Sequence, residues 1–409
     1  MLIQLAIIGL LAALLPLTLV WVSADANKYR KLAWVTVFLT FDLIMFGAFT
    51  RLTDSGLGCP DWPGCYGEAN PFLAHADIHA AQTLMPDGPV TVLKAWIEMV
   101  HRYLAMGVGV LIIALMVIAW RLWFIDPERI KLEPAPLTPA LSQRERVRTA
   151  ARKIKSFPGR INISGRKPAA ALRPGLPSCL LFFVCLQGAF GAWTVTLKLQ
   201  PLIVTIHLLL GMMLLALLTW LAARQSAPAP PARRAATLRL PAMLALALLF
   251  LQLALGGWVS TNYAALACAD FPLCDGALIP QMDFEHGFTL WRHLGKTAAG
   301  DYLPFSALTA IHWVHRSFAF VVIGCMVWVG YRALRIEGLR QTARWLLIAV
   351  GLQFATGIST IFLNWPLAIA VLHNGGAALL VMLLVMLNYK TSISSQALSV
   401  AVRMQSSPL

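Results

Sequence analysis

The sequence predicts an all-α polytopic membrane protein with two pseudo-symmetric four-helix transmembrane bundles and one extra N-terminal transmembrane helix. Three observations lead to this fold class: an apolar composition, nine long apolar runs separated by charged connections, and an internal repeat. Of the 409 residues, 58% are hydrophobic and only 12% are charged, and the mean hydropathy is +0.70. A water-soluble globule of this composition would have too little polar surface, so an ordinary soluble enzyme is excluded.

Nine apolar runs reach the length of roughly 20 residues that a helix needs to cross a bilayer core. The first run has no basic segment before it and is followed by Lys28, Arg30 and Lys31, so we expect an uncleaved helix with its N-terminus outside. The predicted spans are 2–22, 32–50, 96–123, 177–197, 202–223, 240–260, 306–331, 343–363 and 367–388.

Basic residues predict the orientation of these helices. The chain has 33 Lys and Arg against 18 Asp and Glu, a net charge of +15, and every second connection is basic. Because cytoplasmic connections of membrane proteins carry such an excess, the basic loop at 125–175 is expected to be cytoplasmic and solvated. We expect no nucleic-acid partner. The acidic connections 51–95 and 261–305 should face the outside.

An internal repeat organises the chain. Two segments, QGAFGAWTVTLKLQPLIVTIH and QFATGISTIFLNWPLAIAVLH, match at a constant offset of 166, which pairs Gln187 with Gln353, Gly191 with Gly357, Thr194 with Thr360 and His207 with His373. The motif CPDWPGC at 59–65 matches CADFPLC at 268–274, and His101-Arg102 matches His315-Arg316. The repeat therefore predicts two copies of a four-helix unit.

The predicted organisation follows from the repeat and the basic connections. It comprises an extra helix and basic turn (1–31), an N-terminal bundle (32–223) containing the loop 125–175, a cytoplasmic linker (224–239), a C-terminal bundle (240–388) and a cytoplasmic tail (389–409).

The repeat places four histidines near the outer ends of predicted helices: His101, His207, His315 and His373. An imidazole inside a membrane is costly unless it has a partner, and two on facing helices suit axial ligation of a flat, apolar iron porphyrin. The alternative is that each histidine forms a hydrogen bond between helices. Repetition as two pairs favours one bis-histidine haem in each half. No Cys-x-x-Cys-His motif occurs, so thioether attachment is not expected.

The two halves differ one helical turn before the first histidine. Glu98 precedes His101 by three residues, whereas His312 precedes His315 by three. Since this spacing puts both side chains on one helix face, a carboxylate is expected in the first site alone. Glu98 is therefore the candidate catalytic residue. The alternative is that it complements the helix N-terminus or pairs with Arg102.

Two cysteine pairs, Cys59 with Cys65 and Cys268 with Cys274, lie in the outward connections. We expect a disulfide within each loop, because the outside of a bacterial inner membrane is oxidising. Each disulfide is either a structural link or a redox relay near the haem entrance.

Several charged residues lie at or within the predicted helices. Arg51, Arg102 and Arg316 are candidate partners for haem propionates at the outer membrane edge, with lipid phosphate as the alternative. Asp42 lies in mid-helix, where a charge is costly, and is expected to face the bundle and pair with a polar group.

The segments FGAFTRLTDSGLGCPDWPGC, EMVHRYLA and HWVHRSFAF, with the two repeat helices, resemble the haem A synthase family of membrane oxidases. The resemblance implies that His315 and His373 hold haem b, and that His101 and His207 bind the substrate haem with Glu98 beside it. It implies oxidation of the C8 methyl group of haem O to a formyl group, giving haem A for haem-copper oxidases. Haem O synthase, oxidase assembly factors and membrane lipid are candidate partners, and whether a second copy of the chain also binds stays open.

An iron held by two histidines has no free position for dioxygen. Either one histidine leaves, or oxygen is not activated at that iron. We favour electron withdrawal from the substrate macrocycle and capture of water at the oxidised methyl group, with Glu98 stabilising positive charge or accepting a proton.

Two other classes of function stay open from the sequence. A cytochrome b-like electron carrier also uses bis-histidine haems, but predicts two similar sites and no need for Glu98. A transporter also shows repeats, but places its site near the membrane midplane, deeper than these histidines.

Overall fold

The computed structural model describes residues 1–125, 173–226 and 231–406, so most of the basic loop predicted at 125–175 lies outside the described residues. Within them the secondary structure is helical and contains no β-strand. Nine of the described helices are long and apolar enough to cross a membrane. They are α1 (Leu2–Val22), α2 (Lys28–Leu52), α4 (Val92–Phe124), α7 (Gly175–Thr196), α8 (Pro201–Ser226), α9 (Arg239–Thr261), α11 (Phe305–Leu334), α12 (Arg340–Phe362) and α13 (Leu367–Ser406).

Each of the nine predicted spans corresponds to one of these helices, which confirms a multi-pass, all-α membrane protein. Three shorter helices, α3 (His75–Leu84), η1 (Arg233–Leu238) and α10 (Phe284–Gly287), lie in connections. α13 continues to Ser406, through most of the predicted tail at 389–409. Neither glycine nor proline occurs between Gly376 and Pro408, so nothing in the sequence ends the helix where its apolar stretch ends.

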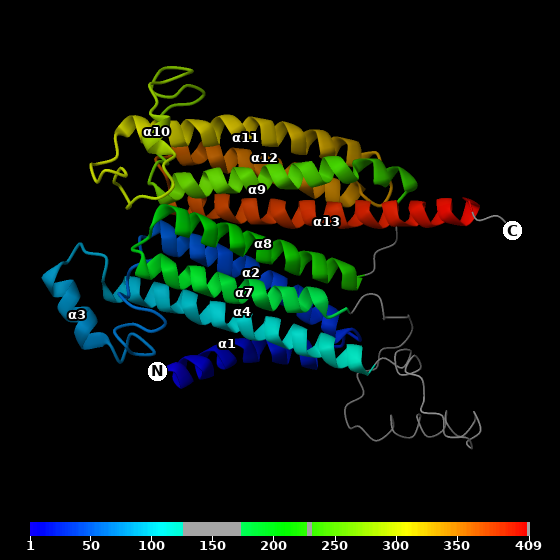
Figure 1. The fold of residues 1–409 in the computed structure, drawn as a ribbon, viewed down its shortest axis with the longest axis horizontal. Coiled ribbons are helices and arrows are strands. Elements are labelled where there is room, and N and C mark those ends of the chain that lie inside the picture. Colours follow the sequence, from blue (N-terminus) through cyan, green and yellow to red (C-terminus); the bar gives the residue numbers. More distant parts are fainter. Residues whose placement is uncertain (126–172, 227–230, 407–409) are drawn as a thin grey trace.

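The helices pack as two sets of four. In the first set, α2 and α7 each pack against both α4 and α8; in the second set, α9 and α12 each pack against both α11 and α13. α8 and α13 contact each other between the sets, and α1 packs outside the first set against α4 and α2 (Figure 1). Equivalent helices of the repeat thus have equivalent neighbours.

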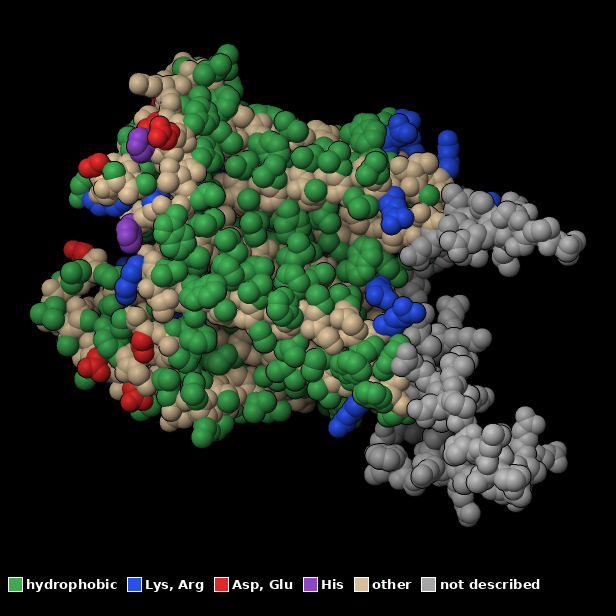
Figure 2. All heavy atoms as spheres, viewed as in Figure 1, with side chains coloured by type: hydrophobic (Ala, Val, Ile, Leu, Met, Phe, Trp, Pro, Cys, Tyr) green, Lys and Arg blue, Asp and Glu red, His purple; other side chains and the backbone are tan. Residues whose placement is uncertain are grey.

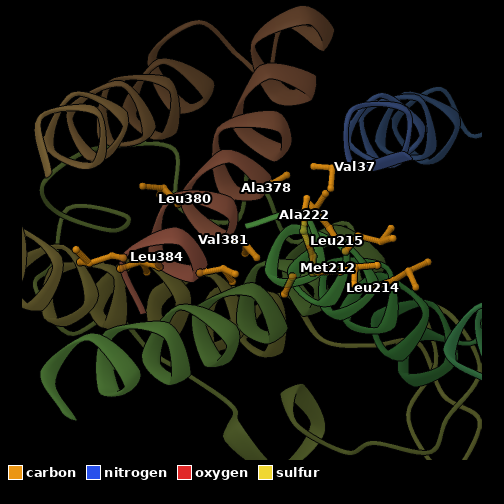
Figure 3. Packing of buried hydrophobic residues seen from close by; sticks show 14 of the residues in the cluster. Val37, Met212, Leu214, Leu215, Ala222, Ala378, Leu380, Val381 and Leu384 are labelled. Atoms are coloured by element: carbon orange, nitrogen blue, oxygen red, sulfur yellow. The ribbon is translucent and has the colours of Figure 1, made fainter. Parts of the chain in front are cut away.

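One cluster of buried apolar side chains runs through both sets. Figure 3 shows Met212 and Leu215 of α8 beside Ala378 and Val381 of α13, where the two sets meet. Gly257 of α9 permits the close approach of α8, since a Cβ atom there would lie 2.9 Å from a methyl group of Leu208.

The two ends of the molecule differ in charge. Figure 2 shows most of the basic side chains at the end where α4 and α13 finish, and the acidic side chains at the end that carries α3 and α10. This separation agrees with the charge pattern that predicted the orientation of the helices.

Asp42 does not face the bundle as predicted. Its side chain lies on the exposed side of α2, while Thr36, Val37 and Thr40 are buried. No partner for its carboxylate is found among the residues that the structure describes. Since lipid-facing and interior-facing side chains of a membrane helix are both apolar, the sequence carried no pattern from which to identify the buried face of α2.

Replacing Gly257 by Leu should overpack the contact between the two sets. The side chain would meet Leu208 and Thr205 of α8, so we expect a loss of about 1–3 kcal/mol in stability. The matched control is Gly351→Leu, since Gly351 is exposed on α12 with no neighbouring atom within 4 Å of an added Cβ. Thermal unfolding in detergent should show a lower midpoint for G257L alone. Equal midpoints for both variants would contradict this packing.

Candidate functional site

Four histidines lie in the N-terminal parts of their helices, two in each set. His315 of α11 and His373 of α13 line one cavity. His101 of α4 and His207 of α8 lie on two helices that both pack against α2 and α7.

The second pair lines a large cavity. It has an empty volume of about 1360 Å³, including the part open to the outside, and His315 and His373 both border it. Most of its lining is apolar; Gln252, Gln353 and Arg316 are among the few polar side chains. Pockets for organic ligands have this character, a mostly apolar lining with a few polar groups, so the lining suits a ligand with an apolar body.

Each histidine rests against a glycine of a neighbouring helix. A Cβ atom at these glycines would lie only 2.9 to 3.2 Å from the imidazole, so a larger residue would displace the ring. The pairs are His101 with Gly47, His207 with Gly191, His315 with Gly256 and His373 with Gly357. Two of these glycines, Gly47 and Gly256, were missed in the sequence, although they share the offset of 209 that relates the two cysteine motifs.

Glutamines contact three of the four imidazoles. Gln187, Gln252 and Gln353 each stand four residues before one of these glycines, on the same helix face. The amides of Gln187 and Gln353, which the repeat pairs, lie 3.4 and 3.3 Å from His207 and His373. Gln252, which the sequence analysis overlooked, lies 3.1 Å from His315.

Glu98 and His312 have equivalent contacts in the two halves. Glu98 is 4% exposed, pairs with Arg102 and accepts a hydrogen bond of 2.9 Å from the backbone N–H of Cys59. His312 is 6% exposed and accepts one of 3.3 Å from the backbone N–H of Cys268. Both side chains therefore hold the first cysteine of an outer loop. What distinguishes the two sites is the chemical nature of this side chain, a carboxyl group against an imidazole.

The two cysteine motifs form closed loops, here called the first Cys loop (59–65) and the second Cys loop (268–274). Their sulfur atoms lie at disulfide-bonding distance, 2.09 Å for Cys59–Cys65 and 2.02 Å for Cys268–Cys274.

An aspartate inside each Cys loop accepts hydrogen bonds from the backbone of the turn that follows the loop. Asp61 accepts hydrogen bonds from the backbone N–H groups of Tyr66 and Gly67. Asp270 accepts them from Asp275 (2.7 Å) and Gly276 (3.0 Å). These N–H donors, that of Gly276 foremost, hold the pKa of Asp270 below its ordinary value.

Two of the predicted propionate arginines hold the Cys loops. Arg102 Nη1 donates to the carbonyl oxygens of Asp61 (3.0 Å), Pro63 (3.2 Å) and Gly64 (2.5 Å). Arg316 donates to those of Asp270 (2.9 Å), Leu273 (2.6 Å) and Cys268 (3.1 Å). Arg316 also borders the cavity, and its Nε is buried without a hydrogen-bond partner in the described structure, so it retains a donor for an anionic group.

Arg51 connects the two helix sets instead. Its guanidinium donates to the carbonyl oxygen of Ser260 (2.7 Å), pairs with Asp54 (3.1 Å) and lies 4.2 Å from the ring centroid of Tyr263. Tyr263 in turn donates to Asp54 (2.6 Å).

Comparison with known proteins gives the family. Residues 30–385 match the COX15-CtaA family, described as cytochrome oxidase assembly protein. This chain belongs to that family. The matched region includes all four histidines, Glu98 and both Cys loops, whereas α1 precedes it.

Several relatives in this family carry the name heme A synthase. One from Shewanella oneidensis is 34% identical over 365 residues, which are 88% of this chain and 96% of that protein. Another from Rhodopseudomonas palustris is 27% identical over 83% of this chain and 84% of that protein. A third, from a Chelativorans species, is 27% identical over 86% of this chain and 89% of that protein.

The Asp270 carboxylate should slow chemical reduction of the Cys268–Cys274 disulfide, because it stabilises the folded loop. The pKa of Asp270 is lowered in the folded state. The carboxylate therefore stabilises the loop fully above the ordinary aspartate pKa of about 3.9, and this stabilisation is lost as pH falls through the folded-state pKa. We therefore expect reduction of Cys268–Cys274 by a phosphine to accelerate only below about pH 4.

Asp270→Asn should be reduced several-fold faster at neutral pH, because an amide oxygen replaces only part of the acceptor capacity. Asp275→Asn is the matched control, because Asp275 donates to Asp270 with its backbone N–H, and the substitution leaves that group in place. Alkylation and mass spectrometry identify the reduced pair. Equal rates for the two variants would contradict this role of Asp270.

Proposed function

We propose that this chain is a haem A synthase, which oxidises the C8 methyl group of haem O to a formyl group and supplies haem A to cytochrome oxidase. The observation that carries the proposal is a difference at equivalent positions of the two sites: Glu98 lies three residues before His101, and His312 lies three residues before His315. An electron carrier with two similar haems would not require this difference. The names of the relatives support the same activity.

The first set of helices is proposed to bind the substrate haem O between His101 and His207. The second set would hold haem b between His315 and His373, where the apolar cavity and the spare Arg316 donor fit a macrocycle with an anionic edge. Haem b, when bound, supplies a one-electron redox centre within the membrane.

The reaction defines what Glu98 must do. Each of two oxidations removes two electrons and two protons from the methyl group and water together, giving first an alcohol and then a hydrate. The hydrate loses one water to leave the aldehyde, so four electrons and four protons depart in total. Arg102 and the Cys59 N–H orient the Glu98 carboxyl group, which we propose accepts a proton from the attacking water or stabilises positive charge on the substrate carbon.

A bacterial inner membrane is the proposed location, with both Cys loops on the periplasmic side. Disulfides form in that oxidising compartment, and the basic end of the molecule would then face the cytoplasm. Haem O synthase and oxidase assembly factors stay predicted partners, and whether a second copy of the chain binds stays open.

Glu98→Gln tests the catalytic role. The amide oxygen can still accept the Cys59 N–H, so the loop and haem binding should persist, while loss of the carboxylate should lower haem A formation by about 10²-fold or more. The control is Glu68→Gln, because Glu68 contributes its backbone groups to the first Cys loop. Haems extracted from cells that also make haem O give the measurement.

A Glu98→Gln variant that binds haem and forms haem A at the normal rate would remove the proposed role of Glu98. Two haem b groups and no haem A, even in the unaltered protein, would favour the electron carrier instead.

The source of the oxygen atom can be tested with isotopes. Water capture predicts that the alcohol formed first carries label from ¹⁸O-water and none from ¹⁸O-dioxygen. The alcohol is the species to analyse, because the aldehyde exchanges its oxygen with water through the hydrate. Mass spectrometry of the extracted alcohol decides the question, and label from dioxygen would overturn water capture.

A further inference from the structure

Three of the four histidines are held by glutamines, and the fourth is not. The glutamine amide nitrogens lie 3.1 to 3.4 Å from an imidazole nitrogen of His207, His315 and His373. Gln252 also donates to the backbone carbonyl of His315, and Thr356 lies 3.0 Å from the second ring nitrogen of His373.

The amides of two of these glutamines are also anchored on the helix that carries the histidine. Gln252 and Gln353 donate to the backbone carbonyl oxygens of His315 (3.1 Å) and His373 (3.0 Å). Each of these glutamines therefore contacts both the ring and the backbone of its histidine, which restricts rotation of the ring.

His101 lacks this support. The residue four before its glycine, Gly47, is Leu43, which packs against the apolar core and offers no hydrogen bond. Among the described residues no hydrogen-bond partner of the His101 imidazole is found, and the ring lies stacked 6.3 Å from that of Phe46.

The orientation of His101 also differs. Its Nε2 is the atom nearest to the position of a Cβ on Gly47, at 3.0 Å, whereas the other three histidines present Cε1 to their glycines. One imidazole in four is therefore turned differently, and it has no hydrogen-bond partner among the residues that the structure describes.

We propose that His101 is the exchangeable haem ligand, and that Leu43 is the positioning residue that leaves it free to rotate while substrate haem enters and product haem leaves. Gln252 and Gln353 hold both histidines of the second pocket and so retain its haem. This rests on the proposed function, since it takes the first pocket as that of the substrate.

The test measures how fast each haem leaves the purified full-length protein. Excess apomyoglobin captures released haem, the loss of the low-spin Soret band gives the rate, and extraction identifies which haem has left. The unaltered protein should lose haem O or haem A in a fast phase and haem b in a slow one.

Placing glutamine at position 43 and leucine at position 252 should reverse the effect of these residues on the rates of haem loss. Leu43→Gln should slow the fast phase by about 10-fold, and Gln252→Leu should accelerate the slow phase by about the same factor. Leu43→Met is the matched control, because methionine resembles glutamine in size but has no amide, and it should leave the fast phase unchanged.

Equal fast phases for Leu43→Gln and Leu43→Met would overturn the inference, as would an unchanged slow phase in Gln252→Leu. Haem loss is measured without turnover, so the experiment distinguishes failure of the proposed Leu43 role from failure of the proposed synthase activity. Haem A formation with unaltered exchange rates contradicts the role of Leu43 alone, whereas the expected exchange rates without haem A formation support that role and contradict the synthase.

Discussion

The placement of four half-buried imidazoles among apolar helices is the constraint on which the rest of the structure depends. A polar ring in such surroundings is stabilised by partners for its nitrogens, and three of the four rings contact a glutamine amide of a neighbouring helix. Glycines such as Gly191 and Gly256 make the close approach of the helices possible because they add no Cβ between helix and ring. One turn away, Gln187 and Gln252 add the amide groups that contact the imidazoles.

The outer Cys loops close over this arrangement with a repeated set of contacts. In each half an arginine next to the first histidine binds loop carbonyls, and the residue three before that histidine accepts a backbone N–H from the first cysteine. The two halves share these loop contacts and differ in the residue that accepts the cysteine N–H, which is Glu98 in one half and His312 in the other. A carboxyl group can therefore replace an imidazole at this position with little change in structure, because the Glu98 and His312 side chains accept the same hydrogen bond.

The two halves contact each other both within the membrane-crossing region and at the helix ends near the Cys loops. Apolar packing of α8 on α13 joins them within the membrane-crossing region, and Arg51 joins the outer end of α2 to Ser260 on α9. Arg51 lies at this junction, and its role toward a propionate stays a prediction. Arg102 and Arg316 likewise bind loop carbonyls, so a role toward a propionate would be additional to holding the loops.

The sequence by itself determined the membrane helices, the repeat, the cysteine pairs and the four histidines, because span length, charge asymmetry and a constant offset are linear properties of the chain. Tertiary structure alone decided which side chains support the histidines and which way Asp42 faces. The physical reason is that lipid and protein interior are similarly apolar, so a membrane helix carries little pattern to mark its buried face. The contacts of Gln252, Gly47 and Leu43 became apparent only once neighbouring helices were in place.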